Sequence, residues 1–288
     1  MKVSHFLRLY EQGYRDFPGI DLSGQDLSGV MLISVDLTGA NLRGVNLSKA
    51  FLTKSNLSQA SLNWANLSCA KISEAQFNQT DLTKADLSGA FMVKSQLIQA
   101  QLSGANLSYT NLRAANLSNA NLCGAKLQKI NLRQANLNGV NFNWANLYEG
   151  RLTGAKFDQT LFNEVNLSQT FLKEVDLSGI NLEGINLSRA KLNGSNLAGA
   201  NLTKANLEEA RLLKVNLQGA NLTGAKLSKA NLAEANLAEA NLTKADLSFA
   251  NLQEAILTNT KLQEALISEA IFSASVNLST SCYWETAS

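Results

Sequence analysis

Several features that are common in globular proteins are scarce in this chain of 288 residues. It has a single proline, Pro18, a single histidine, His5, and only 7% aromatic residues. No pair of a nucleophile with a base is recognisable, and there is no glycine-rich phosphate loop. We therefore expect no catalytic residues and no enzyme activity.

Cysteine is also rare. Cys69, Cys123 and Cys282 lie far apart in the sequence. Their spacing fits neither a disulfide framework nor a metal-binding cluster. We expect no metal site and no cofactor.

Long apolar runs and a strong net charge are both missing. No run approaches the ~20 apolar residues of a membrane-spanning helix, and the N-terminus lacks the apolar core of a signal peptide. The sequence therefore predicts no membrane span and a cytoplasmic location. With 25 basic and 23 acidic residues, the net charge of +2 is neither that of a polyanion nor that of a nucleic-acid-binding polycation.

What the chain does contain is a repeat of five residues. From Arg15 to Ala274 it divides into 52 pentapeptides without an insertion or a deletion, and Ala40–Gly44 is a typical unit. The third residue of every pentapeptide is Leu, Phe, Ile or Met. We number the positions of each pentapeptide one to five.

A period of five matches neither regular element. In a helix the third positions would spiral around the axis, and in a straight strand they would alternate between two faces. They share one side only if the chain turns a corner in every repeat. Of the 18 glycines, 16 occupy position five, where a corner can use a positive φ.

The other positions fit a narrow coil. Position one is mostly alanine and lies two residues before position three, so both should point inward. Position two is Asn or Asp in 32 of the 52 repeats and should point outward, where its side chain can bond to the backbone or to the next coil.

Tandem Ala-(Asn/Asp)-Leu-X-X units resemble the pentapeptide-repeat proteins, and the resemblance covers residues 15–274. It implies an all-β fold, a right-handed quadrilateral parallel β-helix (solenoid) with four repeats per coil. On that basis the repeats form about 13 coils in a rod roughly 60 Å long.

The two ends differ from the repeats. Residues 1–14 are predicted to form a short N-terminal helical cap, because Val3, Phe6, Leu7, Tyr10 and Tyr14 fall near one helical face. Residues 15–274 would be the solenoid. Residues 275–288 lose the repeat and are predicted to be a C-terminal tail or cap.

A weaker period of 20 supports four repeats per coil. When position two is sorted into four columns, three columns depart from Asn or Asp four, four and three times out of 13, and the fourth departs nine times. That column and its neighbouring outward positions mix apolar and basic residues. We call the following set the candidate side: Met31, Phe51, Lys71, Phe91, Val93, Arg113, Arg133, Arg151, Phe171, Lys173, Lys191, Arg211 and Leu213.

Two interpretations of the candidate side are open. Apolar and basic side chains on one face are typical of a docking surface for a protein or for an anionic partner. Alternatively, outward positions vary freely on a repeat scaffold, because isolated exposed apolar residues are common.

The last repeats also carry apolar residues at outward second positions. They are Ile256, Leu266, Ile271 and Val276. Either the tail folds over them, which leaves a monomer, or two rods meet there as an end-to-end homodimer.

These features favour a non-catalytic scaffold or protein-binding rod that presents the candidate side to a macromolecular partner. Some pentapeptide-repeat proteins mimic duplex DNA and bind type II topoisomerases such as gyrase, but the near-neutral charge disfavours this alternative. A second alternative is weak binding of nucleic acid, or of another anionic surface, by the basic residues.

Overall fold

The computed structural model describes residues 2–273 and the backbone of residues 282–283. The chain forms two compact units. Unit 1 comprises residues 1–147 and 155–160, and unit 2 comprises residues 148–154 and 161–288. Both units are built from the same pentapeptide coils.

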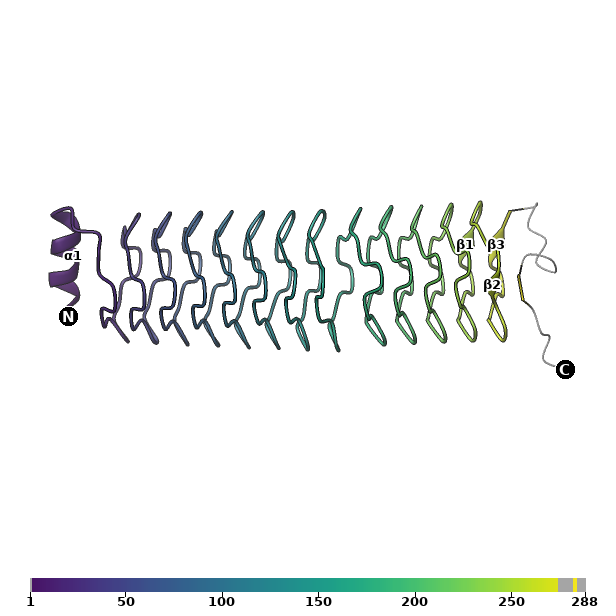
Figure 1. The fold of residues 1–288 in the computed structure, drawn as a ribbon, viewed down its shortest axis with the longest axis horizontal. Helices are drawn as coiled ribbons and strands as arrows, with labels where there is room; N and C mark the ends of the chain where they lie inside the picture. The colour runs from purple at the N-terminus through teal and green to yellow at the C-terminus, as the bar shows by residue number, and fades with distance from the viewer. Residues whose placement is uncertain (1, 274–281, 284–288) are drawn as a thin grey trace. The chain divides into compact units, whose positions relative to one another are not determined.

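Unit 1 begins with helix α1, Val3–Glu11, which lies at the start of the coils in Figure 1. Its apolar face packs on the first coil through Phe6, which is fully buried and makes an edge-to-face contact with Phe17 at 4.7 Å between ring centroids. Gly13, with φ of 98°, lies just beyond the helix, and such a conformation turns the chain away from the helical path. Tyr14 therefore lies outside α1 and is 60% exposed, unlike the buried Phe6.

Within each unit, isolated parallel bridges connect successive coils, between residues that are four pentapeptides apart. In unit 1, Met31 pairs with Phe51 and Phe51 with Lys71, and in unit 2 Phe171 pairs with Lys191. These bridges confirm that four pentapeptides make one coil, as the period of 20 in the sequence predicts. Each unit is therefore a four-sided parallel solenoid.

Most corners of a coil are tight turns closed by one backbone hydrogen bond. The N–H of Ala40, for example, donates to the carbonyl of Leu37 at 3.0 Å. Position five, the third residue of this turn, has a positive φ in every described repeat from Gly19 to Glu269. A positive φ at this place is the mark of a type II turn. The role predicted for position five is thus confirmed at lysine, glutamate and tryptophan as well as at glycine.

The interior of each unit is filled by positions one and three. Leucines such as Leu102 and alanines such as Ala105 are fully buried. Where position one is Ser or Thr, the buried hydroxyl usually donates to a backbone carbonyl of the coil before, as Thr80 does to Leu57 at 2.7 Å, whereas Thr170 donates to Leu167 of its own turn at 2.6 Å. Buried polar groups of this kind are satisfied and do not weaken the core.

The asparagines at position two hold the coils together from outside. The side-chain oxygen of Asn46 accepts from the N–H of Ser48 at 3.1 Å, while its amide donates to Asp26 of the preceding coil at 2.9 Å. Asn46 thus satisfies its own turn and also links two coils.

Among the described residues, four short strands lie at the C-terminal end of unit 2. β1, Asn251–Leu252, pairs in parallel with β3, Ile271–Phe272, at the usual spacing of four repeats. β2, Thr260–Lys261, pairs in parallel with β4, Cys282–Tyr283. Cys282 lies further along the chain than four complete repeats after Thr260, so the five-residue register has ended before β4.

Two kinds of feature are absent from the described residues. No helix there has both the length and the apolar character that crossing a bilayer requires. Among the same residues, no three His, Cys, Asp or Glu side chains are grouped so that they could hold a metal ion.

Candidate functional site: a charged groove on unit 2

In unit 1 the candidate side begins with three apolar residues and one lysine. Met31, Phe51, Lys71 and Phe91 occupy successive coils and are connected by consecutive bridges. Met31 is 60% and Phe91 48% exposed, whereas Phe51 is half-buried. The ammonium group of Lys71 lies 4.7 Å from the centre of the Phe51 ring, a cation–π contact.

The remaining candidate residues of unit 1 lie at position four. Val93 is half-buried, and Arg113 and Arg133 are exposed. The guanidinium of Arg133 donates to Asn131 at 3.1 Å. Here the surface changes from apolar to basic along the same unit.

In unit 2 the candidate side is a ladder of cations around one aromatic ring. Parallel bridges join Arg151 to Phe171, Phe171 to Lys191, and Lys191 to Arg211. The ring of Phe171 lies between two cations, with the Lys191 ammonium at 3.9 Å and the Arg151 guanidinium at 5.8 Å from its centre. Phe171 is consequently half-buried and not freely exposed.

The two other candidate residues of unit 2 contribute less. Lys173 is exposed and forms an ion pair with its neighbour Glu174 at 3.0 Å, while Leu213 is half-buried. An exposed pair of this kind adds little to stability.

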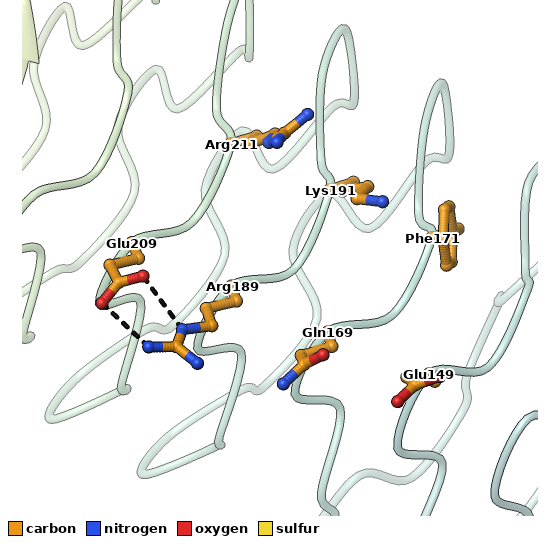
Figure 2. A pocket seen from close by; sticks show the side chains of 7 residues that line it. All are labelled: Glu149, Gln169, Phe171, Arg189, Lys191, Glu209 and Arg211. Carbon is orange, nitrogen blue, oxygen red and sulfur yellow. Dashed lines mark hydrogen bonds and ion pairs between the residues drawn. The ribbon is translucent and has the colours of Figure 1, made fainter.

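Phe171, Lys191 and Arg211 of this ladder form one wall of an open groove with a volume of about 440 Å³, and Arg151 lies one coil beyond that wall. Figure 2 shows two rows of side chains, one from position two and one from position five of the preceding repeat. The first row is Phe171, Lys191 and Arg211, and the second is Glu149, Gln169, Arg189 and Glu209. The groove therefore follows an edge between two sides of the coil.

One arginine of the groove is already occupied. Arg189 binds Glu209 of the next coil through two hydrogen bonds, of 2.9 and 3.1 Å (Figure 2). The hydrogen bond from Arg189 lowers the pKa of Glu209, and the same bond raises the pKa of Arg189. Both groups stay charged near neutral pH, and their charges cancel.

Three cations remain available. Within residues 2–273, neither Arg151, Lys191 nor Arg211 forms an ion pair with a carboxylate. The groove can therefore attract negative charge at the row from position two, whereas the row from position five is close to neutral at Arg189 and Glu209. It is suited to recognition by charge and shape.

The sequence did not predict the second row of the groove. The four columns of the sequence analysis group residues that share one side of the coil. The groove lies along an edge between two sides, so the candidate side does not include Gln169, Arg189 and Glu209. Each precedes a member of the candidate side by two residues, namely Phe171, Lys191 and Arg211. Sorting by edges as well as by sides would have found them.

Other exposed aromatic and apolar residues lie elsewhere. Trp64 and Trp144 occupy position five of unit 1 and are 58% and 59% exposed. At the C-terminal end of unit 2, the outward residues Ile256, Leu266 and Ile271 are 52%, 61% and 50% exposed. Val276, predicted to belong with them, lies outside the described residues.

Comparison with known sequences identifies the repeat. The chain matches the family described as Pentapeptide repeats in eight copies, which cover residues 15–44, 46–83, 80–119, 115–154, 141–179, 180–219, 216–253 and 235–273. The fold of this family is the right-handed quadrilateral β-helix, as the resemblance implied. A search of curated proteins found no match to the chain.

Several solved structures are similar. HetL, a pentapeptide-repeat protein involved in the regulation of heterocyst differentiation in the cyanobacterium Nostoc, is 31% identical over 94% of each chain, with a TM-score of 0.35. QnrB1, a plasmid-mediated fluoroquinolone resistance protein, is 15% identical over 90% of this chain and 92% of its own, with a TM-score of 0.30. Rfr23 of the cyanobacterium Cyanothece is 27% identical over 55% of this chain and 98% of its own, with a TM-score of 0.23.

Proposed function

Because this chain belongs to the pentapeptide-repeat family, we propose that it is a non-catalytic scaffold that binds a protein partner through the candidate side. The supporting observation is chemical. On three sides of the coil, position two is mostly Asn or Asp, which bonds within the solenoid, whereas on the candidate side it is mostly an apolar or cationic residue.

The apolar part of this surface lies in unit 1. Met31 and Phe91 expose about half or more of their surface, although a serine or an asparagine would serve the scaffold at these positions. Exposed apolar groups beside basic ones are typical of protein interfaces, where a few anchors contribute most of the affinity. Phe51 and Phe171 are weaker candidates for apolar anchors, because lysine side chains partly cover their rings.

The two alternatives have less support. A mimic of duplex DNA needs a surface of negative charge, and the candidate side is cationic. Binding of nucleic acid would use the same cations, but it leaves the exposed Met31 and Phe91 without a role.

The test is a quantitative capture of partners from extracts of the native cell. The variant Met31→Ser/Phe91→Ser should retain at least tenfold less of the partner than the wild type does, since each change removes an apolar anchor. The matched control is Trp64→Ser/Trp144→Ser, which removes two aromatic residues of similar exposure from another edge of unit 1.

The control variant should capture the partner as the wild type does. If the two variants lose the partner equally, or neither loses it, the candidate side is not the docking surface. Circular dichroism of both variants verifies that the coils are intact.

A further inference from the structure

The groove of unit 2 contains a regular series of groups that defines the shape of a ligand. The row from position two consists of Phe171, Lys191 and Arg211, one residue per coil, and the ladder continues beyond the groove to Arg151 in the coil before Phe171. Parallel strands are ~4.8 Å apart, so relative to Arg211 the other three lie at ~4.8, ~9.6 and ~14.4 Å. A ligand that contacts all of them needs groups at the same intervals.

An α-helix supplies these intervals. Its rise of ~1.5 Å per residue places positions i+3, i+7 and i+10 at ~4.5, ~10.5 and ~15 Å from position i, all on one face. Each of these distances is within ~1 Å of the corresponding distance along the ladder. An extended strand offers same-face residues only every ~6.7 Å, so it loses the register by the third coil.

The charges decide what the helix carries. A carboxylate is the complementary group for each of the three cations, Lys191, Arg211 and Arg151. An apolar side chain is the complementary group for Phe171. An arginine without an ion-pair partner binds a carboxylate well because its planar fork matches the two oxygens. The contact between Lys191 and Phe171 holds the ammonium group in place before a ligand arrives.

The second row of the groove argues against a nucleic acid. Its side chains are Glu149, Gln169 and the Arg189–Glu209 ion pair, so the row offers no continuous positive surface to a series of phosphates. An amphipathic helix can carry its acidic residues on one face and present neutral or basic residues toward this row.

We propose that the groove of unit 2 binds an acidic amphipathic α-helix of a protein partner, with carboxylates at positions i, i+3 and i+10 and an apolar residue at i+7. This inference rests on the proposed function, because it names the chemistry of the partner for one part of the candidate side. The helix lies along the ladder and crosses four coils.

The test uses two synthetic helical peptides and the full-length chain. One peptide carries Glu at i, i+3 and i+10 and Leu at i+7 in an alanine-rich background. The other has the same composition, with the four residues distributed around the helix. Fluorescence anisotropy at low salt should show the patterned peptide binding about tenfold more tightly, because only it meets all three cations at once.

Two charge-matched variants locate the site. Arg151→Gln/Lys191→Gln/Arg211→Gln should lose this preference. The control, Lys126→Gln/Lys156→Gln/Lys226→Gln, removes the same charge from exposed second positions on other sides and should keep it.

Three results would overturn the inference: equal binding of the two peptides, equal loss in both variants, or tighter binding of a single-stranded thymidine oligonucleotide of the same charge. None of these would affect the capture experiment with Met31→Ser/Phe91→Ser, which tests the proposed function separately. The two ideas can therefore fail independently.

Discussion

At the scale of single residues, position five bears the main backbone cost of the fold. Its φ lies near +60° in every described repeat, although the residue there is often not glycine. Residues with a β-carbon pay about 1–2 kcal/mol for this conformation. Glycine avoids that cost but loses more entropy on folding, about 0.5–1 kcal/mol.

Glu239 offers a test of this balance, since its φ is 61°. Glu239→Gly should raise the free energy of unfolding by about 0.5 kcal/mol, whereas Glu239→Val should lower it by more than about 1 kcal/mol. Urea unfolding measures both changes. The control is Ala238→Gly, at a residue outside the positive-φ set, which should destabilise by about 1 kcal/mol. Glycine variants of equal stability at the two positions would contradict this account.

The aspartates at position two connect stability to pH. The N–H of Ser28, and next its hydroxyl, donate to Asp26 and lower its pKa. Asp21 and Asp176 have lowered pKa values because Ser23 and Ser178 donate to them in the same way.

A carboxylate with a lowered pKa stabilises the fold above the unfolded-state value, near pH 4, and the stabilisation is lost as pH falls through the folded-state value. Asp21→Asn/Asp26→Asn keeps the acceptor oxygen, as Asn46 shows, and removes the titration. This variant should therefore lose less stability than the wild type between pH 7 and pH 3 in thermal unfolding. A steeper loss would mean that the bonds from serine are not the cause.

At the scale of elements, the repeated structure is the turn with its outward asparagine. The sequence predicted this turn well, because a period of five fits neither a helix nor a straight strand and requires one corner in every repeat. The buried positions, the position of the positive φ and the coil of four repeats are all confirmed. Such short-range patterns are visible in the sequence because each repeat meets the same surroundings.

The site was harder to predict, for reasons that belong to side chains. The period assigns Phe51 and Phe171 to the surface, but it cannot show that Lys71 and Lys191 lie over their rings. Nor can it show that Arg189 is bound to Glu209, whereas Arg211 forms no ion pair within residues 2–273. These differences depend on side-chain conformation across two coils, which a count along the chain does not contain.

Helix α1 allows a separate prediction, because it covers the first coil mainly through the ring of Phe6. Phe6→Ala removes a fully buried side chain that contacts Phe17, and burial of this size is worth about 3–5 kcal/mol. The loss should be local, since each coil contacts only its neighbours. Hydrogen exchange at the Leu22 amide should accelerate more than tenfold, while exchange at Leu202 stays unchanged. Ser4→Ala, at an exposed site on α1, is the control, and a uniform change along the chain would contradict local capping.

At the scale of the whole molecule, the first and last described coils differ. In unit 1 a helix covers the first coil. In unit 2 the inward residues Ile267 and Phe272 of the last described coil are half-buried, whereas Leu247 and Leu252 one coil earlier are 0% and 1% exposed. A partly open coil beside exposed apolar residues favours contact with another chain.

We therefore expect self-association through the C-terminal end of unit 2. In light scattering at rising concentration, the wild type should exceed the mass of one 31.0 kDa chain. Ile256→Ser/Leu266→Ser/Ile271→Ser should stay at that mass, because the change removes the exposed apolar groups. A wild type that is monomeric at all concentrations would show that the end is not an interface.

The ladder of bridges between successive coils also has a consequence for how the chain folds. Parallel β-proteins usually fold slowly, since their strands must find partners far away in the sequence. Here a separation of 20 in a chain of 288 residues is a relative contact order of roughly 0.07, at the low end of the range for helical bundles. Any two adjacent coils can then act as a nucleus, and the remaining coils add one after another, as in a zipper.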